Sequence, residues 1–390
     1  MGEEQKLTAE QEMIREVLRW DESQTDRLRG QAPQGIDWPQ VEAFCLEQGV
    51  LPLFYSRLKK VLDFKTGPED LERLKTLFRI NAERNLRMAG KLIQLIGLLN
   101  DQGVMALPFK GPALAIQAYG DLSLRQISDL DLFIPPGQAI EAVRILEKAG
   151  FVSDFRLAEK MKNRLIRGGK DLWLIQKDLQ IDIHQQMPEG PRSYALREIL
   201  WEDTGSVLLL DRKIPVLSLE NTCLVLCLQG AEDGWNSLSR VCDLIFLIKN
   251  NPALNWERLF QKAGESRMTA ILGLGLLLGQ EVSGASLPVE AGLPLREIKR
   301  LKTMAASLYR GWFRGSPASP RLTLLPKVMD HWWDACRYLT YFAFTPRTSD
   351  LKWLPLPPCL YPLYYFLHPL RLSFKFSPSF LRSLSGRKKV

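Results

Sequence analysis

The feature that most limits the fold of this chain is a change in the spacing of its apolar residues near residue 104. From Leu7 to about Asn100 apolar residues recur at helical spacing, beginning after Thr8, a predicted N-cap. Short runs of alternating apolar and polar residues follow, the pattern of half-buried strands. The chain therefore combines a mixed α/β unit, roughly residues 104–210, with helical regions on both sides.

Within this unit the sequence predicts three strands and two helices. The strands fall at Leu130–Ile134, Leu172–Gln176 and Leu179–His184, and the helices at Ala113–Tyr119 and Gln138–Ala149. Helical spacing returns after Ser218, a predicted cap of a helix through Leu228, and continues over Leu238–Ile248 and Trp256–Leu278. We divide the chain into an N-terminal helical region (1–100), an α/β core (101–215), a helical domain (216–315) and a Pro-rich, aromatic, basic C-terminal extension (316–390).

The net charge of +8 comes mostly from the end of the chain. After Asp350 there is no acidic residue, whereas seven basic residues follow: Lys352, Arg371, Lys375, Arg382, Arg387, Lys388 and Lys389. A nucleic-acid-binding surface is more often a basic stripe across a folded domain. The charge therefore argues only weakly for a polynucleotide substrate.

Other features indicate a cytoplasmic protein without a transmembrane segment. The N-terminal residues lack the basic and apolar regions of a secretory signal, and four prolines interrupt the apolar stretch Trp353–Phe366. The six scattered cysteines lie mostly in apolar surroundings, as free thiols do in a reducing compartment: Cys45, Cys223, Cys227, Cys242, Cys336 and Cys359.

Three aspartates are predicted to gather on the polar faces of two strands. Asp129 and Asp131 are two apart and therefore project to the same side, while Leu130 faces the core. In the second strand Asp182 projects opposite to its apolar neighbours. Crowded carboxylates are stabilised by a cation, and Mg²⁺ prefers hard oxygen ligands. Three carboxylates can hold two metal ions about 3.5 to 4 Å apart, and Asp182 is also a candidate base.

The turn before these strands offers a place for phosphate. Gly111 allows close approach of the backbone, and Pro112 suits the first position of a helix, whose free N–H groups bind anions. Lys110 adds a positive charge, Arg125 is expected to brace a phosphate or hold Asp129, and Ser128 to hydrogen-bond a triphosphate.

Each of these residues also has a purely structural interpretation. Asp-x-Asp alone is common on exposed strand faces, and it is the combination with Lys110-Gly111, Arg125 and Asp182 that favours catalysis. His184 is expected to have a minor role, because a lone strand histidine is usually packed or hydrogen-bonded. Cys223 and Cys227, one helical turn apart, are expected to be buried thiols because no metal-ligand pattern accompanies them.

The segments Phe109–Ala115 and Arg125–Ile134 resemble the Lys-Gly-x-Ala-Leu-Ala and Arg-x-Ser-Asp-hydrophobic-Asp signature of an uncharacterised bacterial nucleotidyltransferase family in the DNA polymerase beta-like superfamily. The similarity covers roughly residues 40 to 280 and includes Asn81–Asn85, Ile181–His184 and Trp235–Leu247. More distantly, the turn resembles that of toxin nucleotidyltransferases.

The resemblance implies an α+β fold: a small mixed sheet with flanking helices, between N-terminal and C-terminal helical regions. It also implies an NTP donor, Mg²⁺ with Mn²⁺ as a substitute, and catalytic roles for Asp129, Asp131 and Asp182. The sequence departs from the superfamily at Gly111-Pro112, which removes a hydroxyl and an N–H, and at Gln229, where relatives often have His.

The sequence therefore predicts transfer of a nucleoside monophosphate from an NTP to a hydroxyl of an unidentified acceptor. A small metabolite, a natural-product intermediate or a protein is favoured over RNA. The alternative is a catalytically inactive nucleotide-binding or scaffold module. The aromatic, basic extension is expected either to pack on the helical domain or to contact an anionic membrane surface.

Overall fold

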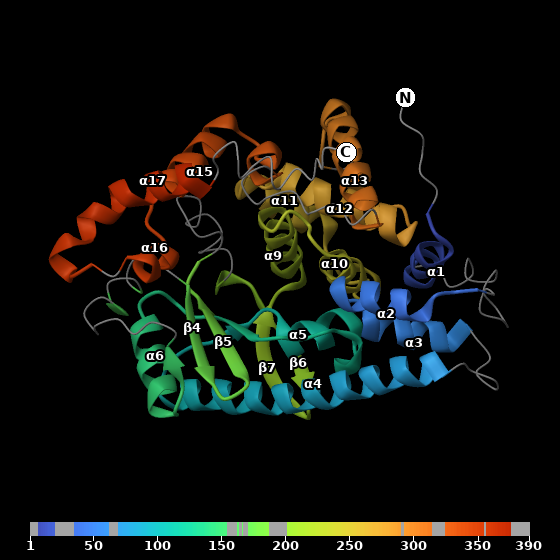
Figure 1. Ribbon diagram of the computed structural model, residues 1–390, viewed down its shortest axis with the longest axis horizontal. Helices are drawn as coiled ribbons and strands as arrows, with labels where there is room; N and C mark the ends of the chain where they lie inside the picture. The colour runs from blue at the N-terminus through green and yellow to red at the C-terminus, as the bar shows by residue number, and fades with distance from the viewer. Residues whose placement is uncertain are drawn as a thin grey trace.

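The computed structural model describes residues 7–19, 35–61, 69–153, 162–163, 166, 171–186, 201–289, 292–313, 324–354 and 356–375. The expectations for residues 376–390 of the basic tail lie outside this part of the chain. Figure 1 shows the sheet low in the molecule, a long helix along its lower side and the C-terminal helices above it.

Four helices precede the sheet: α1 (Ala9–Leu18), α2 (Trp38–Glu47), α3 (Leu51–Val61) and α4 (Glu69–Asp101). The predicted cap of α1 is confirmed, because the Thr8 hydroxyl accepts a hydrogen bond from the Gln11 backbone and the Gln11 side chain bonds back to Thr8. The helix α4 has 33 residues and runs beneath the sheet (Figure 1).

The central sheet has five strands in the order β1 (Leu107–Pro108), β2 (Leu130–Phe133), β5 (Leu179–His184), β4 (Leu172–Gln176) and β3 (Val152–Ser153). β2 and β5 are parallel, and the other neighbours are antiparallel. The predicted α+β class with a small mixed sheet is therefore confirmed. The three predicted strands are also confirmed, apart from Ile134 at the end of β2.

The helix predicted over Ala113–Tyr119 is present, but it consists of two parts: a short α-helix, α5 (Gly111–Leu114), and a π-helical turn, η3 (Ala115–Tyr119). The core also contains strands that the sequence pattern did not predict, among them β1 and β3. An additional hairpin consists of β6 (Thr204–Leu209) and β7 (Arg212–Leu217). The predicted amphipathic helix is α6 (Ala139–Lys148).

The helical domain begins with α9 (Leu219–Glu232), whose predicted cap Ser218 is confirmed, and continues with α10 (Leu238–Asn250). The pattern predicted over 256–278 is two helices, because Arg267 has a positive φ between α11 (Trp256–Glu265) and α12 (Thr269–Ser283). The remaining main helices are α13 (Leu295–Phe313), α15 (Trp332–Phe344), α16 (Thr348–Trp353) and α17 (Tyr364–Lys375).

Two hydrophobic clusters hold these elements together. One lies between the sheet, α6 and the second half of α4. The other joins the N-terminal helices α1 to α3 to α9, α10, α12 and α13, and it includes Leu107 and Phe133 from the sheet. The two helical regions, far apart in the sequence, therefore share one core that adjoins the edge of the sheet. Within the described residues, no helix combines the length and apolar character needed to cross a bilayer.

Candidate active site

The pairing of β2 with β5 places two of the predicted aspartates side by side. Asp131 is the direct partner of Asp182 in the parallel register. Asp131, Asp182 and His184 can each direct one ligand atom to a common point, with these atoms within 4.8 Å of one another. Asp129 immediately precedes β2 and accepts a hydrogen bond from the Ser128 hydroxyl at 2.9 Å.

His184 is more closely integrated into this cluster than its sequence context predicted. Its Nε2 lies 3.2 Å from Asp131 Oδ1, and its Nδ1 lies 3.1 Å from Asp171 Oδ2. Burial opposes protonation of the imidazole, but Asp171 and Asp131 outweigh it and raise the pKa of His184 to about 10. Because both ring nitrogens face carboxylates, His184 is better suited to orienting Asp131 than to binding a metal ion.

The two paired aspartates have opposite electrostatic environments. Burial disfavours the ionised form of Asp131, yet Lys110, His184 and Arg125 together lower its pKa to about 2. Burial raises the pKa of Asp182 to about 6, and Asp131 and Asp129 add to this effect against the hydrogen bond from Gln180. Asp131 is therefore a firmly ionised carboxylate, whereas the charge on Asp182 lacks compensation.

These residues fit a divalent cation. Asp131 and Asp182 provide oxygen ligands from adjacent strands. Asp129 lies two residues before Asp131, immediately before β2 begins. Burial is the main cause of the raised pKa of Asp182, and repulsion from Asp131 and Asp129 adds to it; a bound cation would offset both. The Asp-rich set favours Mg²⁺ or Mn²⁺ over the softer metals that select thiolates or several imidazoles.

The loop carrying Lys110 and Gly111 lies against the start of β2. Gly111 has φ +57°, and a Cβ atom there would lie 3.2 Å from the backbone oxygen of Asp129. The glycine therefore allows the loop to approach the aspartate backbone. Lys110 Nζ is 4.0 Å from Asp131 Oδ1, which places a cation beside the candidate metal ligands without a close ion pair.

Arg125 has a different partner from the one expected. Its Nε donates to both carboxylate oxygens of Asp243, at 3.0 and 3.1 Å, and does not hold Asp129. Asp243 on α10 also accepts a hydrogen bond from the hydroxyl of Tyr119 at 2.9 Å. This buried network ties the loop before β2 to the helical domain. Sequence reasoning did not assign a role to Asp243, although the segment containing it carried part of the family resemblance.

Polar residues of α4 fix the same loop. Asn81 and Asn85 donate side-chain hydrogen bonds to the backbone oxygen of Arg125 at 3.1 and 2.7 Å, and Arg84 donates to that of Ser128 at 3.1 Å. The three side chains have helical spacing, so they project from one side of α4. These hydrogen bonds connect the segment 81–85, which is part of the family resemblance, to the loop that leads into the aspartate motif.

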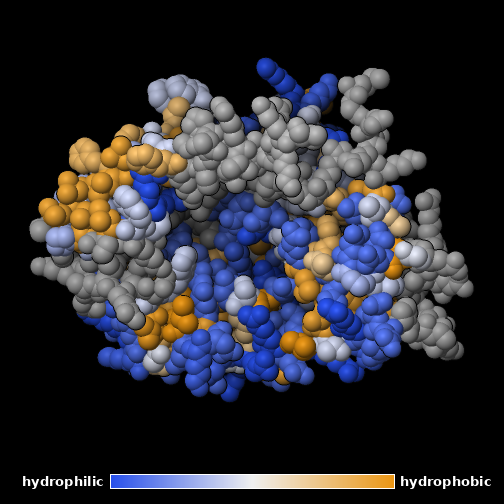
Figure 2. Space-filling model, in the orientation of Figure 1, coloured by the Kyte–Doolittle hydropathy of each residue, from blue (hydrophilic) through white to orange (hydrophobic). Residues whose placement is uncertain are grey.

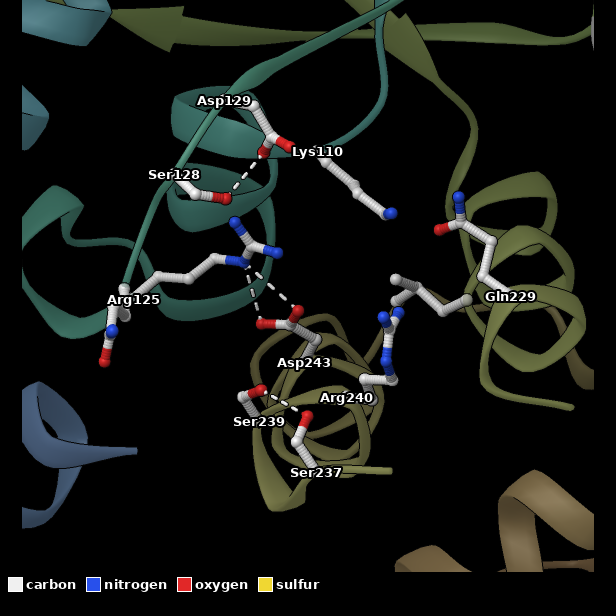
Figure 3. Close-up of a pocket in the computed structure, with 11 residues that line it drawn as sticks. Lys110, Arg125, Ser128, Asp129, Gln229, Ser237, Ser239, Arg240 and Asp243 are labelled. Carbon is white, nitrogen blue, oxygen red and sulfur yellow. Dashed lines mark hydrogen bonds and ion pairs between the residues drawn. The ribbon is translucent and has the colours of Figure 1, made fainter. Parts of the chain in front are cut away.

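A polar cavity of about 220 Å³ lies between this loop and the helical domain. Figure 3 shows Lys110, Ser128 and Asp129 on one side and residues of α9 and α10 on the other. The lining residues are Lys110, Arg125, Gln126, Ser128, Asp129, Leu226, Gln229, Ser237, Ser239, Arg240 and Asp243. The structure thus brings three predicted phosphate-site residues, Lys110, Arg125 and Ser128, to one cavity beside Asp129.

Comparison with known proteins gives a family and no individual relative. Residues 34–284 match the family described as an uncharacterised nucleotidyltransferase. This match spans more than half of the chain and contains all the predicted site residues. The comparison with curated proteins and the comparison with solved structures gave no match.

We expect Mg²⁺ or Mn²⁺ to raise the melting temperature of the protein, because a cation that binds only the folded state stabilises it. At a concentration a hundred times its Kd the gain is about 2.7 kcal/mol. In Asp131→Asn the cation-dependent shift should disappear. Asp178→Asn is the matched control, since Asp178 is exposed in the turn between β4 and β5. Equal shifts in all three proteins, or none in the wild type, would contradict a cation site here.

Proposed function

Because the chain belongs to this uncharacterised nucleotidyltransferase family, we propose that it transfers a nucleoside monophosphate from an NTP to a hydroxyl of an acceptor. The observation that carries the proposal is the alignment of Asp131 with Asp182 on adjacent parallel strands, beside a cationic polar cavity. Asp129, at the start of β2, lines that cavity and completes the carboxylate set.

In the proposed reaction, the acceptor oxygen forms a bond to the α-phosphorus of the NTP as the bond to the β-phosphate bridging oxygen breaks. Pyrophosphate leaves with that electron pair, and the acceptor proton passes to a carboxylate or to water. Two Mg²⁺ ions, or Mn²⁺ in their place, would supply activation of the hydroxyl and stabilisation of the leaving pyrophosphate. Asp129, Asp131 and Asp182 would hold them.

Asp182 is proposed as the third ligand or as the base that accepts the proton. Burial raises the pKa of Asp182 to about 6 in the protein without a bound cation, so Asp182 is a stronger base than Asp131. Asp131 is unsuited to that role, because its pKa of about 2 makes it a weak base. His184 and Asp171 would keep Asp131 oriented from behind.

The phosphate contacts are proposed for Lys110, Gly111, Arg125 and Ser128. Lys110 and Ser128 line the cavity with Asp129. Arg125 uses its Nε for Asp243, so its role in phosphate binding would involve the outer guanidinium nitrogens. The family implies an NTP, whereas the acceptor classes remain those expected from the sequence: a small molecule, a natural-product intermediate or a protein, before RNA.

A non-catalytic nucleotide-binding or scaffold module is the second candidate. Gly111-Pro112 favours it, because proline contributes no backbone N–H to a phosphate cradle. The three carboxylates and the compensating charges around Asp131 favour catalysis. Binding of NTP without release of pyrophosphate in the presence of every acceptor fraction would identify the module.

We also propose that the C-terminal helices contact an anionic membrane surface from the cytoplasmic side. Large apolar side chains are exposed on α15, α16 and α17. Figure 2 shows a hydrophobic area over this end of the molecule. They include Trp332, Trp333, Phe344, Trp353, Tyr365, Phe366, Leu370 and Phe374. Aromatic side chains of this kind favour the headgroup region of a bilayer.

The charges in these helices are compatible with an anionic surface. The three acidic residues of segment 324–375 are all engaged in the protein interior or with backbone groups. Asp350 is buried against His368 and Arg371, Asp334 is buried near Arg267, and Asp330 accepts hydrogen bonds from the start of α12. Other aromatics pack, since Tyr364 and Tyr338 are buried. Packing therefore accounts for some aromatic side chains of the extension, and the proposed membrane contact concerns the exposed ones.

For the transfer reaction, purified protein should release pyrophosphate and form a labelled product from an α-labelled NTP, Mg²⁺ and cell extract. Replacing residues that only support metal ligands already lowers metal affinity or activity about 10- to 100-fold. The transfer rates of Asp129→Asn, Asp131→Asn and Asp182→Asn should therefore each fall by more than about a hundredfold. Asp178→Asn should retain full transfer. Undiminished labelling by Asp129→Asn or Asp131→Asn would remove the catalytic proposal.

For the membrane contact, anionic liposomes should co-sediment the protein at low salt and release it as the salt concentration rises, because screening weakens surface attraction. The double variant Phe366→Ser and Phe374→Ser should sediment less. Leu208→Ser, an exposed apolar position on the β6 hairpin, is the control. Equal sedimentation of both variants and the wild type would refute a contact through α17.

A further inference from the structure

We infer that the cavity between the loop before β2 and the helical domain is a subsite for a phosphate-bearing ligand, with Arg240 and Gln229 as recognition residues. This deepens the proposed function and rests on it for the identity of the reaction. Neither residue belongs to the strands that carry the aspartates. Gln229 comes from α9 and Arg240 from α10, so the helical domain would supply half of the subsite.

The first argument is charge. Three cationic side chains line the cavity: Lys110, Arg125 and Arg240. In Figure 3, Lys110 and Arg240 extend toward the same space from opposite sides. Asp243 pairs with Arg125, Asp233 pairs with Arg240, and Asp129 belongs to the proposed cation site. What the cavity offers an anion is therefore Lys110 and those guanidinium N–H donors of Arg125 and Arg240 that their carboxylate partners leave unused.

Arg240 is held in position for such a contact. Its Nε donates to the side-chain oxygen of Asn236 at 3.0 Å, and one outer nitrogen lies 2.5 Å from Asp233 Oδ2. Its side chain is about one quarter exposed. A guanidinium has five N–H donors in a fixed fork, so these two contacts leave donors that can bind phosphate oxygens.

The second, independent argument is an unsatisfied buried amide. Gln229 is only 7% exposed and lines the cavity, and its Oε1 has no hydrogen-bond partner among the residues that the structure describes. Leaving such a group unpaired costs about 1 to 3 kcal/mol. The amide can present its oxygen to a ligand hydroxyl or, turned over, its N–H to a phosphate oxygen. A phosphate-bearing ligand with hydroxyls provides either partner.

Two serine hydroxyl groups complete the lining of the cavity, whereas the first two backbone N–H groups of α10 are already engaged within the protein. Ser237 and Ser239 form a hydrogen bond of 2.9 Å with each other at the start of α10. The backbone N–H groups of Leu238 and Ser239 donate to Gln48. On the α10 side of the cavity, recognition of an anion would therefore depend on side chains, which makes it testable by substitution.

Two groups could occupy a phosphate-binding subsite here: the triphosphate of the donor NTP and a phosphate on the acceptor. The test begins with calorimetric titration of inorganic tripolyphosphate into the full chain in EDTA, so that no metal ion contributes to binding. Arg240→Gln should weaken binding roughly tenfold to a hundredfold, the range for a hydrogen bond to a charged group. Gln229→Met, which keeps the buried volume, should weaken it about two- to tenfold. Arg144→Gln, an exposed arginine on α6 paired with Glu141, should bind like the wild type.

Competition then identifies the source of the phosphate. If tripolyphosphate displaces a labelled, non-hydrolysable NTP analogue in Mg²⁺, the subsite binds the donor; if both bind together, it binds the acceptor. Equal affinity of Arg240→Gln, Gln229→Met and wild type for tripolyphosphate, or no binding by the wild type, would overturn the subsite. Neither result depends on turnover, so a failure of the proposed transfer reaction would be recognised separately.

Discussion

The candidate active site depends on the parallel pairing of β2 with β5. This register aligns Asp131 with Asp182, while Leu130 and Leu132 pair with Ile181 and Ile183 on the opposite, buried side. A slip of one residue in either strand would reverse its faces and place a carboxylate in the apolar core. The hydrophobic alternation that stabilises the sheet is therefore also what gathers the acidic residues.

Charged networks behind the carboxylates connect that pair to the rest of the molecule. His184 and Asp171 support Asp131 from within the sheet. Arg125, Tyr119 and Asp243 connect the loop before β2 to α10. A buried ion pair contributes little net stability but is costly to break, so it suits the fixing of a geometry more than the strengthening of a fold. The position of the helical domain is thus coupled to the loop that precedes Asp129.

The local parts of this arrangement were predictable from the sequence. Alternation located β2, β4 and β5, and the two caps Thr8 and Ser218 lie where their helices begin. Asp129, Asp131 and Asp182 were candidates because their apolar neighbours fix the opposite strand face. Their catalytic roles remain predictions, since geometry alone does not test them.

The non-local parts were not predictable. The partner of Arg125 is 118 residues away, and nothing in the local pattern distinguishes Asp243 from an ordinary helical carboxylate. His184 has a central position only because the fold brings Asp171 and Asp131 to its two nitrogens. The π-helical turn after Leu114 and the positive φ of Arg267 are conformations that the spacing of apolar residues does not encode.

The central claim is that Asp131 and Asp182 jointly bind a divalent cation beside the polar cavity. Its most direct test is anomalous diffraction at the manganese edge from crystals of the full chain grown with Mn²⁺. The account predicts an anomalous peak between the two carboxylates, about 2.0 to 2.2 Å from their oxygens by analogy with other small divalent ions. Ordered carboxylates with no peak between them, at a Mn²⁺ concentration that saturates any binding seen in solution, would contradict it.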